Sequence, residues 1–90
     1  MSEGAVEVTV KYLVSLADKT GKRKETMELD PGATLEDLSR RLNREYGLTL
    51  PDPRIMAVLN GRGWEQYPDK LETELRGGDT VLLFPPIAGG

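Results

Sequence analysis

The 90-residue sequence contains neither cysteine nor histidine. Without cysteine the chain has no disulfide framework, no thiolate nucleophile and no zinc–thiolate site. Without histidine it lacks the usual general base near neutral pH and the commonest ligand of transition metals. Fifteen acidic residues could still supply a carboxylate pair, but their spacing identifies none. These absences argue against self-contained catalysis and against a metal site.

Nucleotide-binding loops and long apolar runs are missing as well. The glycine-containing stretches Gly61–Gly63 and Arg76–Asp79 match neither the dinucleotide-binding motif nor the P-loop motif. We therefore expect no cofactor bound by the chain itself. The longest apolar run has only a few residues, whereas about 20 are needed to span a bilayer. The opening "MSEGAVEV" has no basic-then-apolar leader, so we expect a cytoplasmic protein that does not enter a membrane.

The charge balance is slightly acidic, with a net charge of −3 and 30% charged residues. This balance disfavours nucleic acid as the main partner. A basic cluster surrounds Gly21 in what reads as a hairpin turn, and we interpret it as a solvated loop rather than a phosphate site; it consists of Lys19, Lys22, Arg23 and Lys24. Length and composition together predict one small globular domain.

The first half of the chain predicts a hairpin followed by a helix. Val6–Leu13 and Lys24–Leu29 alternate apolar and polar residues, as half-buried strands do. A helix is expected over Thr34–Tyr46, because Thr34 and Asp37 form a capping box and Gly47 suits its end. Its apolar stripe comprises Leu35, Leu38, Leu42 and Tyr46, and its expected ion pairs are Glu36–Arg40 and Asp37–Arg41.

The second half predicts a buried strand at Ile55–Asn60 and a last strand at Thr80–Pro85. Between them we expect one short strand, a turn at Pro68-Asp69, and Trp64 at a strand edge. A central place for the last strand, beside the first, would explain its apolar run "VLLF". The result is a two-layer α+β domain with one helix across a mixed sheet. The expected core is Val8, Val10, Leu35, Leu38, Leu42, Val58, Val81 and Leu83.

The end of the sequence, "FPPIAGG" (Phe84–Gly90), differs from an ordinary polar terminus. Pro85 and Pro86 fix φ and favour extended neighbours, so the segment is expected to project as a semi-rigid spacer. Glycines without Cβ pass through narrow channels and leave the terminal carboxylate unhindered. We therefore divide the chain into a domain at residues 1–84 and a tail at residues 85–90. We therefore interpret the tail as a substrate on which partner proteins carry out the chemistry. A terminal Gly-Gly alone, however, also occurs by chance.

The segment "GDTVLLFPPIAGG" (Gly78–Gly90) resembles the C-terminal signature of the MoaD-type small subunit of molybdopterin synthase. The order of elements matches the ubiquitin-like β-grasp fold that these sulfur carriers share with the thiamine carrier ThiS. The Phe-Pro-Pro run and the chain length resemble MoaD more than ThiS. Residues Gly61–Asp79 resemble archaeal-type members, some of which also modify proteins.

The resemblance implies a mixed sheet of four to five strands and a specific reaction at Gly90. An E1-like adenylating enzyme would use ATP to activate the Gly90 carboxylate, and a sulfur donor would convert it to a thiocarboxylate. The tail would then enter the large subunit of molybdopterin synthase. The implied partner-binding residues are Phe84, Pro85, Pro86, Ile87, Ala88 and Gly89.

Three alternatives stay open at the level of the sequence. The same activated terminus would serve a protein modifier joined to lysines through Gly90, or a sulfur carrier for thiamine or tRNA thiolation. The third is a passive β-grasp binding module with an incidental tail. Phe84 could equally be a partner anchor or an ordinary core residue.

Overall fold

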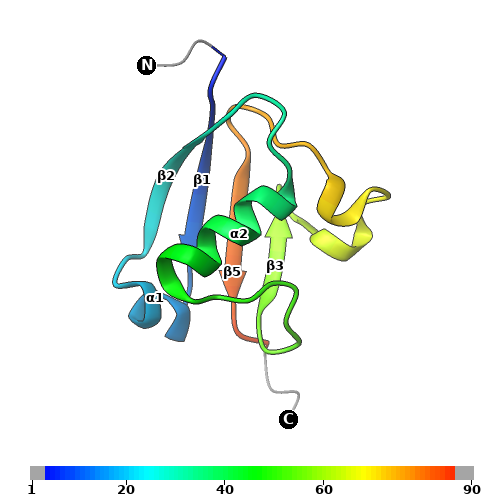
Figure 1. The fold of residues 1–90 in the computed structure, drawn as a ribbon. Helices are drawn as coiled ribbons and strands as arrows, with labels where there is room; N and C mark the ends of the chain where they lie inside the picture. The colour runs from blue at the N-terminus through cyan, green and yellow to red at the C-terminus, as the bar shows by residue number, and fades with distance from the viewer. Residues whose placement is uncertain (1–3, 87–90) are drawn as a thin grey trace.

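The computed structural model describes residues 4–86 and contains a five-stranded mixed sheet in the order β2-β1-β5-β3-β4 (Figure 1). The strands are β1 (Val6–Tyr12), β2 (Lys24–Leu29), β3 (Met56–Leu59), β4 (Arg62–Gly63) and β5 (Thr80–Phe84). The helices are α1 (Ser15–Thr20) and α2 (Leu35–Tyr46), with single-turn 3₁₀ helices η1 (Trp64–Gln66) and η2 (Lys70–Glu72). The predicted ubiquitin-like β-grasp fold is confirmed.

Helix α2 lies across one face of the sheet, as its sequence predicts. The Thr34 hydroxyl accepts from the backbone N–H of Asp37, and the Asp37 carboxylate accepts from the backbone N–H of Thr34 at 2.8 Å. Gly47 ends the helix in the left-handed conformation, which favours glycine. The leucines of the stripe are fully buried against the sheet. Both ends of α2 are therefore set by local sequence, and its orientation is set by burial.

One of the two ion pairs predicted on α2 is wrong. The Glu36–Arg40 pair forms, with 3.4 Å between Nη2 and Oε1. The Asp37 carboxylate is instead occupied by the capping box. Arg41 turns to Glu45, with 2.7 Å between Nε and Oε2.

Strand β5 occupies the centre of the sheet, as predicted. It runs parallel to β1, with Val10 beside Val81, and antiparallel to β3, with Val58 opposite Leu82. A central strand has a neighbour on both edges, so all its backbone groups can be paired within the sheet. The end of β5 is therefore held by two other strands.

The expected simple turn between the first two strands contains a short helix. Leu16 buries its side chain under the sheet end, and Gly21 ends α1 with a positive φ of 78°. The buried Leu16 holds the connection "VSLADKT" against the core, whereas a solvated hairpin loop would make no such contact. Of the basic cluster, Lys19 lies in α1 and Lys24 in β2, and all four side chains are exposed.

The ambiguous segment after β3 forms one two-residue strand and the two 3₁₀ turns. Trp64 was expected at a strand edge but lies in η1 and is buried. Its indole N–H has no hydrogen-bond partner among the residues that the structure describes. The large aromatic side chain therefore contributes mainly packing to this segment.

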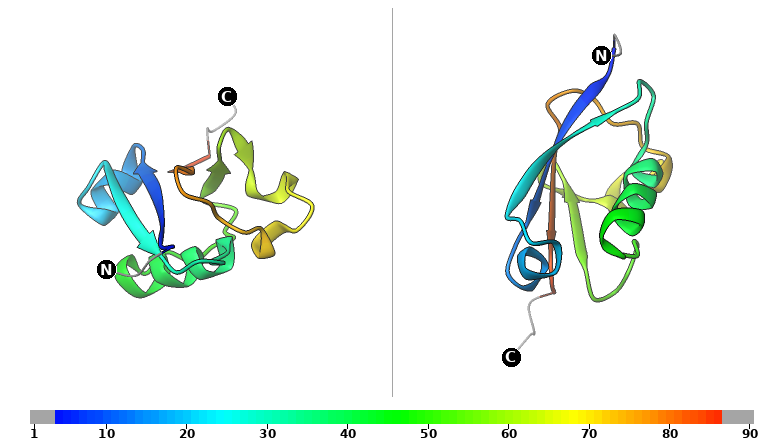
Figure 2. Two further views of the ribbon diagram at one scale, coloured as in Figure 1. Left: turned by 90° about the horizontal axis from the view of Figure 1, so that it is seen from above. Right: turned by 60° about the vertical axis from the view of Figure 1, so that its left-hand side comes forward.

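The sheet has one face buried beneath α2 and another that we call the outer face. In the right-hand view of Figure 2, α2 lies to one side of the strands. Seven of the eight predicted core residues are fully buried. Val58 is the exception, because the alternation of β3 turns Ala57 and Leu59 toward α2 and leaves Val58 half-buried on the outer face.

Candidate functional site at the end of strand β5

The predicted tail begins where β5 ends at Phe84. Pro85 is half-buried and Pro86 is exposed. The neighbouring β1 runs parallel to β5 and ends at the same end of the sheet. There the Leu13 N–H donates to the Leu83 carbonyl at 2.9 Å. Ile87, Ala88, Gly89 and Gly90 lie outside the described residues, so their predicted roles and the domain boundary at residue 84 stay predictions.

Phe84 lies outside the core cluster and is half-buried on the outer face. It pairs across the sheet with Met56, the first residue of β3. One step further along the strands, Leu82 pairs with Val58 on the same face. These four side chains form an apolar patch that begins at the point where the tail leaves the sheet; we call it the exit patch (Leu82, Phe84, Met56 and Val58).

The sequence analysis missed two further apolar residues at this end of the molecule. Leu13 is 41% exposed and Val14 is 76% exposed. Together with Met56, which is 42% exposed, they are the only large hydrophobic side chains in residues 4–86 that expose more than two fifths of their surface. All three lie at the ends of β1 and β3 that flank the exit of β5. The signal in the sequence is that "YLV" continues apolar where a polar turn is expected.

The backbone at Val14 is unusual. Its φ of 57° and ψ of −128° fall in a region that β-branched residues rarely adopt. Such conformations cost about 1–3 kcal/mol each and persist only where the surroundings impose them. An exposed valine that is held in this conformation contributes little to the core, so its place beside the tail is a candidate contact point.

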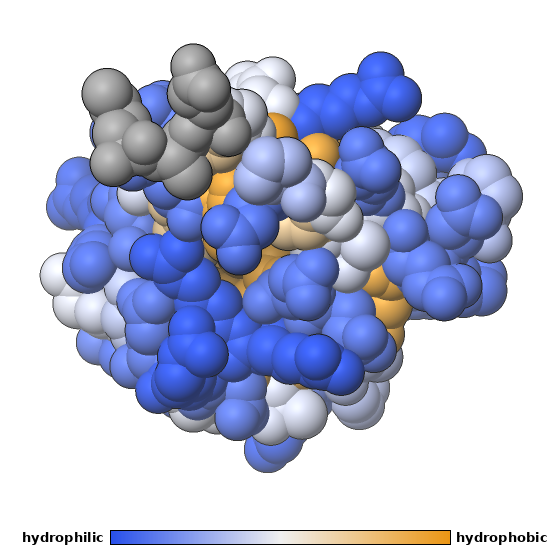
Figure 3. Space-filling view, turned by 45° about the horizontal axis from the view of Figure 1, so that its top comes forward, coloured by the Kyte–Doolittle hydropathy of each residue, from blue (hydrophilic) through white to orange (hydrophobic). Residues whose placement is uncertain are grey.

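The view in Figure 3 shows a different surface. The end of the molecule away from the β5 exit is predominantly hydrophilic, and apolar atoms are visible mainly in recesses between hydrophilic side chains. Exposed apolar residues are therefore unevenly distributed. Clustering of exposed apolar side chains is typical of an interaction site.

A partly buried polar cluster centres on Glu25 at the same end of the sheet, but on the α2 side. Its carboxylate accepts from the Tyr12 hydroxyl at 2.5 Å, from the Tyr46 hydroxyl, and from Lys22 Nζ at 3.2 Å. Burial alone would raise the pKa of Glu25, but these hydrogen bonds more than offset burial and lower it. Burial raises the pKa of the Tyr12 hydroxyl, and the Glu25 carboxylate raises it further. The cluster joins the last turn of α2 to β1 and β2.

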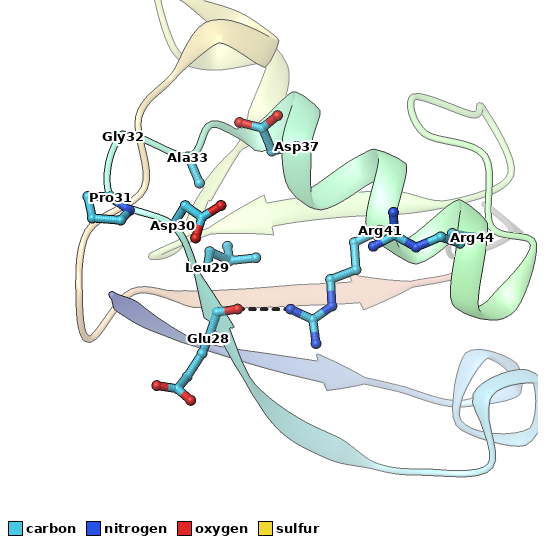
Figure 4. Close-up of a pocket in the computed structure, with 9 residues that line it drawn as sticks. All are labelled: Glu28, Leu29, Asp30, Pro31, Gly32, Ala33, Asp37, Arg41 and Arg44. Carbon is cyan, nitrogen blue, oxygen red and sulfur yellow. Dashed lines mark hydrogen bonds between the residues drawn. The ribbon is translucent and has the colours of Figure 1, made fainter. Parts of the chain in front are cut away.

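A groove of about 330 Å³ lies between the loop after β2 and helix α2 (Figure 4). Its charged side chains do not converge on one point. Arg41 reaches across to donate to the Glu28 carbonyl at 2.9 Å, while the Glu28 carboxylate points away from it. Arg41 also pairs with Glu45. The groove is thus occupied by a structural contact between the helix and the sheet.

No group of three or more acidic side chains in residues 4–86 is placed to hold a metal ion. Within the same residues, no helix is long and apolar enough to cross a membrane. On the outer face, the side chains nearest the exit are apolar or lysine. This end of the molecule therefore presents a contact surface around the end of β5.

Comparison with known proteins agrees with this geometry. The ThiS family matches residues 10–90. The chain is 30% identical to small archaeal modifier protein 3 of Haloferax volcanii over 94% of this chain and 100% of that protein. It is 36% identical to an Archaeoglobus fulgidus protein named "Putative sulfur carrier protein", over 96% of this chain and 78% of the other.

A solved structure from Pyrococcus furiosus, titled "Putative molybdopterin converting factor, subunit 1", superposes with a TM-score of 0.76. The identity is 27%, covering 91% of this chain and 99% of that one. The family match begins at Val10 within β1 and continues through α2 and β5 to Gly90. The chain therefore belongs to the ThiS family of ubiquitin-like sulfur carriers and modifiers.

Proposed function

We propose that the chain is a sulfur carrier that works through the carboxylate of Gly90, as the small subunit of molybdopterin synthase. The observation that carries the proposal is that the central strand β5 leads through Pro85 and Pro86 into "IAGG". Membership of the ThiS family supports it. The similarity to a protein titled as a molybdopterin converting factor subunit supports the choice of acceptor.

The proposed chemistry begins with an unreactive group. A free α-carboxylate has a pKa of about 3.3–3.7, so it is ionised at neutral pH and is a poor electrophile. An E1-like activating enzyme joins it to the α-phosphate of ATP and releases pyrophosphate. Sulfide-level sulfur (HS⁻) from a donor then attacks the acyl carbon and displaces AMP, and loss of its proton leaves a thiocarboxylate. The chain itself supplies no cofactor, and the ATP is bound by the activating enzyme.

The body and the tail have separate tasks in this proposal. Four residues follow Pro86, and a fully extended segment of that length spans about 13–14 Å. Such a tail reaches into a partner's active site while the sheet stays outside. The two prolines restrict the segment before it binds, which lowers the entropy lost on docking. The partners in turn are the activating enzyme, the sulfur donor and the large synthase subunit, in the cytoplasm.

A second candidate function is protein modification. The match to small archaeal modifier protein 3 over the whole of that protein favours it. In this case the activated Gly90 forms an isopeptide bond with a lysine of a target protein. Carriage of sulfur to thiamine or tRNA would use the same activated terminus. Lysine conjugates on an immunoblot of the host cell would identify the modifier, and a thiocarboxylate bound to a synthase subunit would identify the carrier.

Deletion of Gly90 tests the shared requirement for the terminus. Removing one residue withdraws the carboxylate by about 3.5 Å, far outside the distance tolerance of a near-attack geometry. We expect the truncated protein to melt like the wild type but not to form a thiocarboxylate with ATP, its activating enzyme and a sulfur donor. Intact-mass spectrometry reads the exchange of one oxygen for one sulfur. A variant with one residue added after Gly90 should fail equally, and equal sulfur loading of all three proteins would refute the proposal.

A further inference from the structure

The outer face of the sheet carries charges that are separated along the strands. On β1 and β2, Lys11 lies opposite Lys24, and Glu7 lies opposite Glu28. The pair Thr9 and Thr26 lies between them. The lysine pair is at the end from which the tail departs, and the glutamate pair is at the other end.

Both like-charged pairs are unfavourable for the isolated domain. Tyr12 N–H donates to Arg23 O at 2.8 Å, which makes the adjacent pair of Lys11 and Lys24 a non-hydrogen-bonded one. Side chains lie closest in such pairs, and like charges directly opposite are destabilising. Within residues 4–86, neither lysine and neither glutamate of these pairs forms an ion pair. Replacing one residue of either pair by a residue of opposite charge would create a favourable contact. The sequence nevertheless has two like charges in both pairs.

The lysine pair is continuous with the exit patch. Lys11 pairs with Leu82 on its other side, and Leu82 pairs with Val58. One cross-sheet row therefore reads Lys24, Lys11, Leu82, Val58. Phe84 and Met56 form the next row toward the tail. An apolar patch with a cationic margin is complementary to an apolar surface bordered by carboxylates.

We propose that Lys11 and Lys24 are the electrostatic margin of the docking surface for the activating enzyme, and that this enzyme presents acidic side chains to them. The inference rests on the proposed function. We assign the surface to the activating enzyme because it is the partner that both the carrier and the modifier require. The glutamate pair lies at the other end of the two strands, outside this surface, so it serves as the internal control.

The test compares two charge reversals on the same strand. Lys24→Glu and Glu28→Lys each convert a like-charged pair to an opposite pair, so both should raise the melting temperature by about 2–8 °C. The probe is the activating enzyme encoded in the same genome, and the readout is pyrophosphate release as a function of carrier concentration. Lys24→Glu should raise KM about tenfold at low salt, whereas Glu28→Lys should leave KM within about twofold of wild type.

Two more variants and a salt series complete the experiment. Arg76→Glu makes the same change in net charge as Lys24→Glu but lies before β5, at the end away from the exit, and it should leave KM unchanged. Lys11→Thr removes one lysine without adding a carboxylate and should raise KM by a smaller factor. The advantage of wild type over Lys24→Glu should shrink as ionic strength rises from about 0.05 to 0.5 M, because salt screens exposed charges.

Each outcome has one meaning. A higher KM for Lys24→Glu that salt abolishes, with Arg76→Glu unaffected, supports the margin. An active wild type with equal KM values for Lys24→Glu and Glu28→Lys at every salt concentration overturns the inference and leaves the proposed function standing. Release of no pyrophosphate with the wild type would instead count against the proposed function itself.

Discussion

At the scale of single residues, Glu25 connects three separate segments through its carboxylate. Its side chain is 14% exposed and accepts hydrogen bonds from Tyr12, Tyr46 and Lys22. These partners come from β1, from the last turn of α2, and from the segment between α1 and β2. A buried carboxylate keeps its charge only where donors compensate its lost hydration. The hydrogen bonds that keep Glu25 ionised therefore also fix one end of the domain.

We predict that Glu25→Gln flattens the acid side of the stability profile. The pKa of Glu25 is lowered in the folded protein, so the group stabilises the fold above its unfolded pKa of about 4.3. That contribution is lost as the pH falls through the lower folded value. Urea titrations between pH 7 and pH 3 should show wild type losing more free energy of unfolding than Glu25→Gln does.

The matched control for this prediction is Glu36→Gln, since the Glu36 side chain is 51% exposed in a helix-surface pair. Exposed pairs contribute little to stability. The free energy of unfolding of Glu36→Gln at pH 7 should therefore stay close to that of wild type. An identical profile for Glu25→Gln and wild type would show that the cluster contributes no pH dependence.

At the scale of elements, the junction between β1 and α1 combines two opposing features. Leu16 is buried and holds α1 against the sheet, while Val14, two residues earlier, is exposed in a strained conformation. Val14 occupies the N-cap position of α1 but makes no side-chain capping hydrogen bond. Glycine would adopt its backbone angles without a steric penalty. The valine is thus costly for folding and available for binding.

We predict that Val14→Gly stabilises the isolated protein and weakens its reaction with the activating enzyme. Relief of the strained φ should exceed the entropy cost of glycine, for a gain of about 0.5–2 kcal/mol in the free energy of unfolding. Loss of the exposed isopropyl group beside the exit patch should raise KM for the carrier. Urea titration and pyrophosphate release measure the two effects.

Lys70→Gly serves as the control for the junction. Lys70 also has a positive φ, of 49°, but it lies in η2. It should gain stability in the same sense as Val14→Gly and leave KM unchanged. If Val14→Gly lost stability, the strain at the junction would not be a cost to the fold.

At the scale of the whole molecule, the two faces of the sheet have different uses. The α2 face supplies the core, and the outer face carries the exit patch with its lysine margin. Because β5 lies between β1 and β3, the tail starts from the centre of that outer face's apolar end. Stability and recognition are thereby placed on opposite sides of one sheet.

We predict that Phe84→Ala separates these two uses from each other. Phe84 lies outside the core cluster, so its truncation should lower the free energy of unfolding by less than that of Leu83→Ala. Leu83 is fully buried beneath α2, and its truncation should cost about 2–5 kcal/mol. Phe84→Ala should nevertheless raise KM with the activating enzyme about tenfold, since interface energy concentrates in a few aromatic anchors. A protein unfolded by Phe84→Ala would identify this residue as part of the core.

Much of the fold was predictable because the deciding interactions are local. The capping box of Thr34 and Asp37, the leucine stripe of α2 and the alternation in β1 and β2 each lie within a few residues of sequence. The errors fall where a distant contact decides. Leu16 packs into the hydrophobic core, and this distant contact stabilises α1 where the sequence predicts a hairpin loop. Val58 faces outward because the register of β3 against β5 places Leu59 beneath α2.

The candidate site divides in the same way. The composition of the tail, with Pro85 and Pro86 before Gly90, and the apolar run that predicts a central place for β5 can be read from the sequence. The side chains around the exit are brought together by folding and could not be identified from the sequence. Leu13 and Met56 are far apart in sequence, and the pairing of Lys11 with Lys24 depends on strand register. Register is set by burial of one face of the sheet, and a shift of one residue would exchange the two faces. The docking surface is therefore a consequence of how the core packs on the other side.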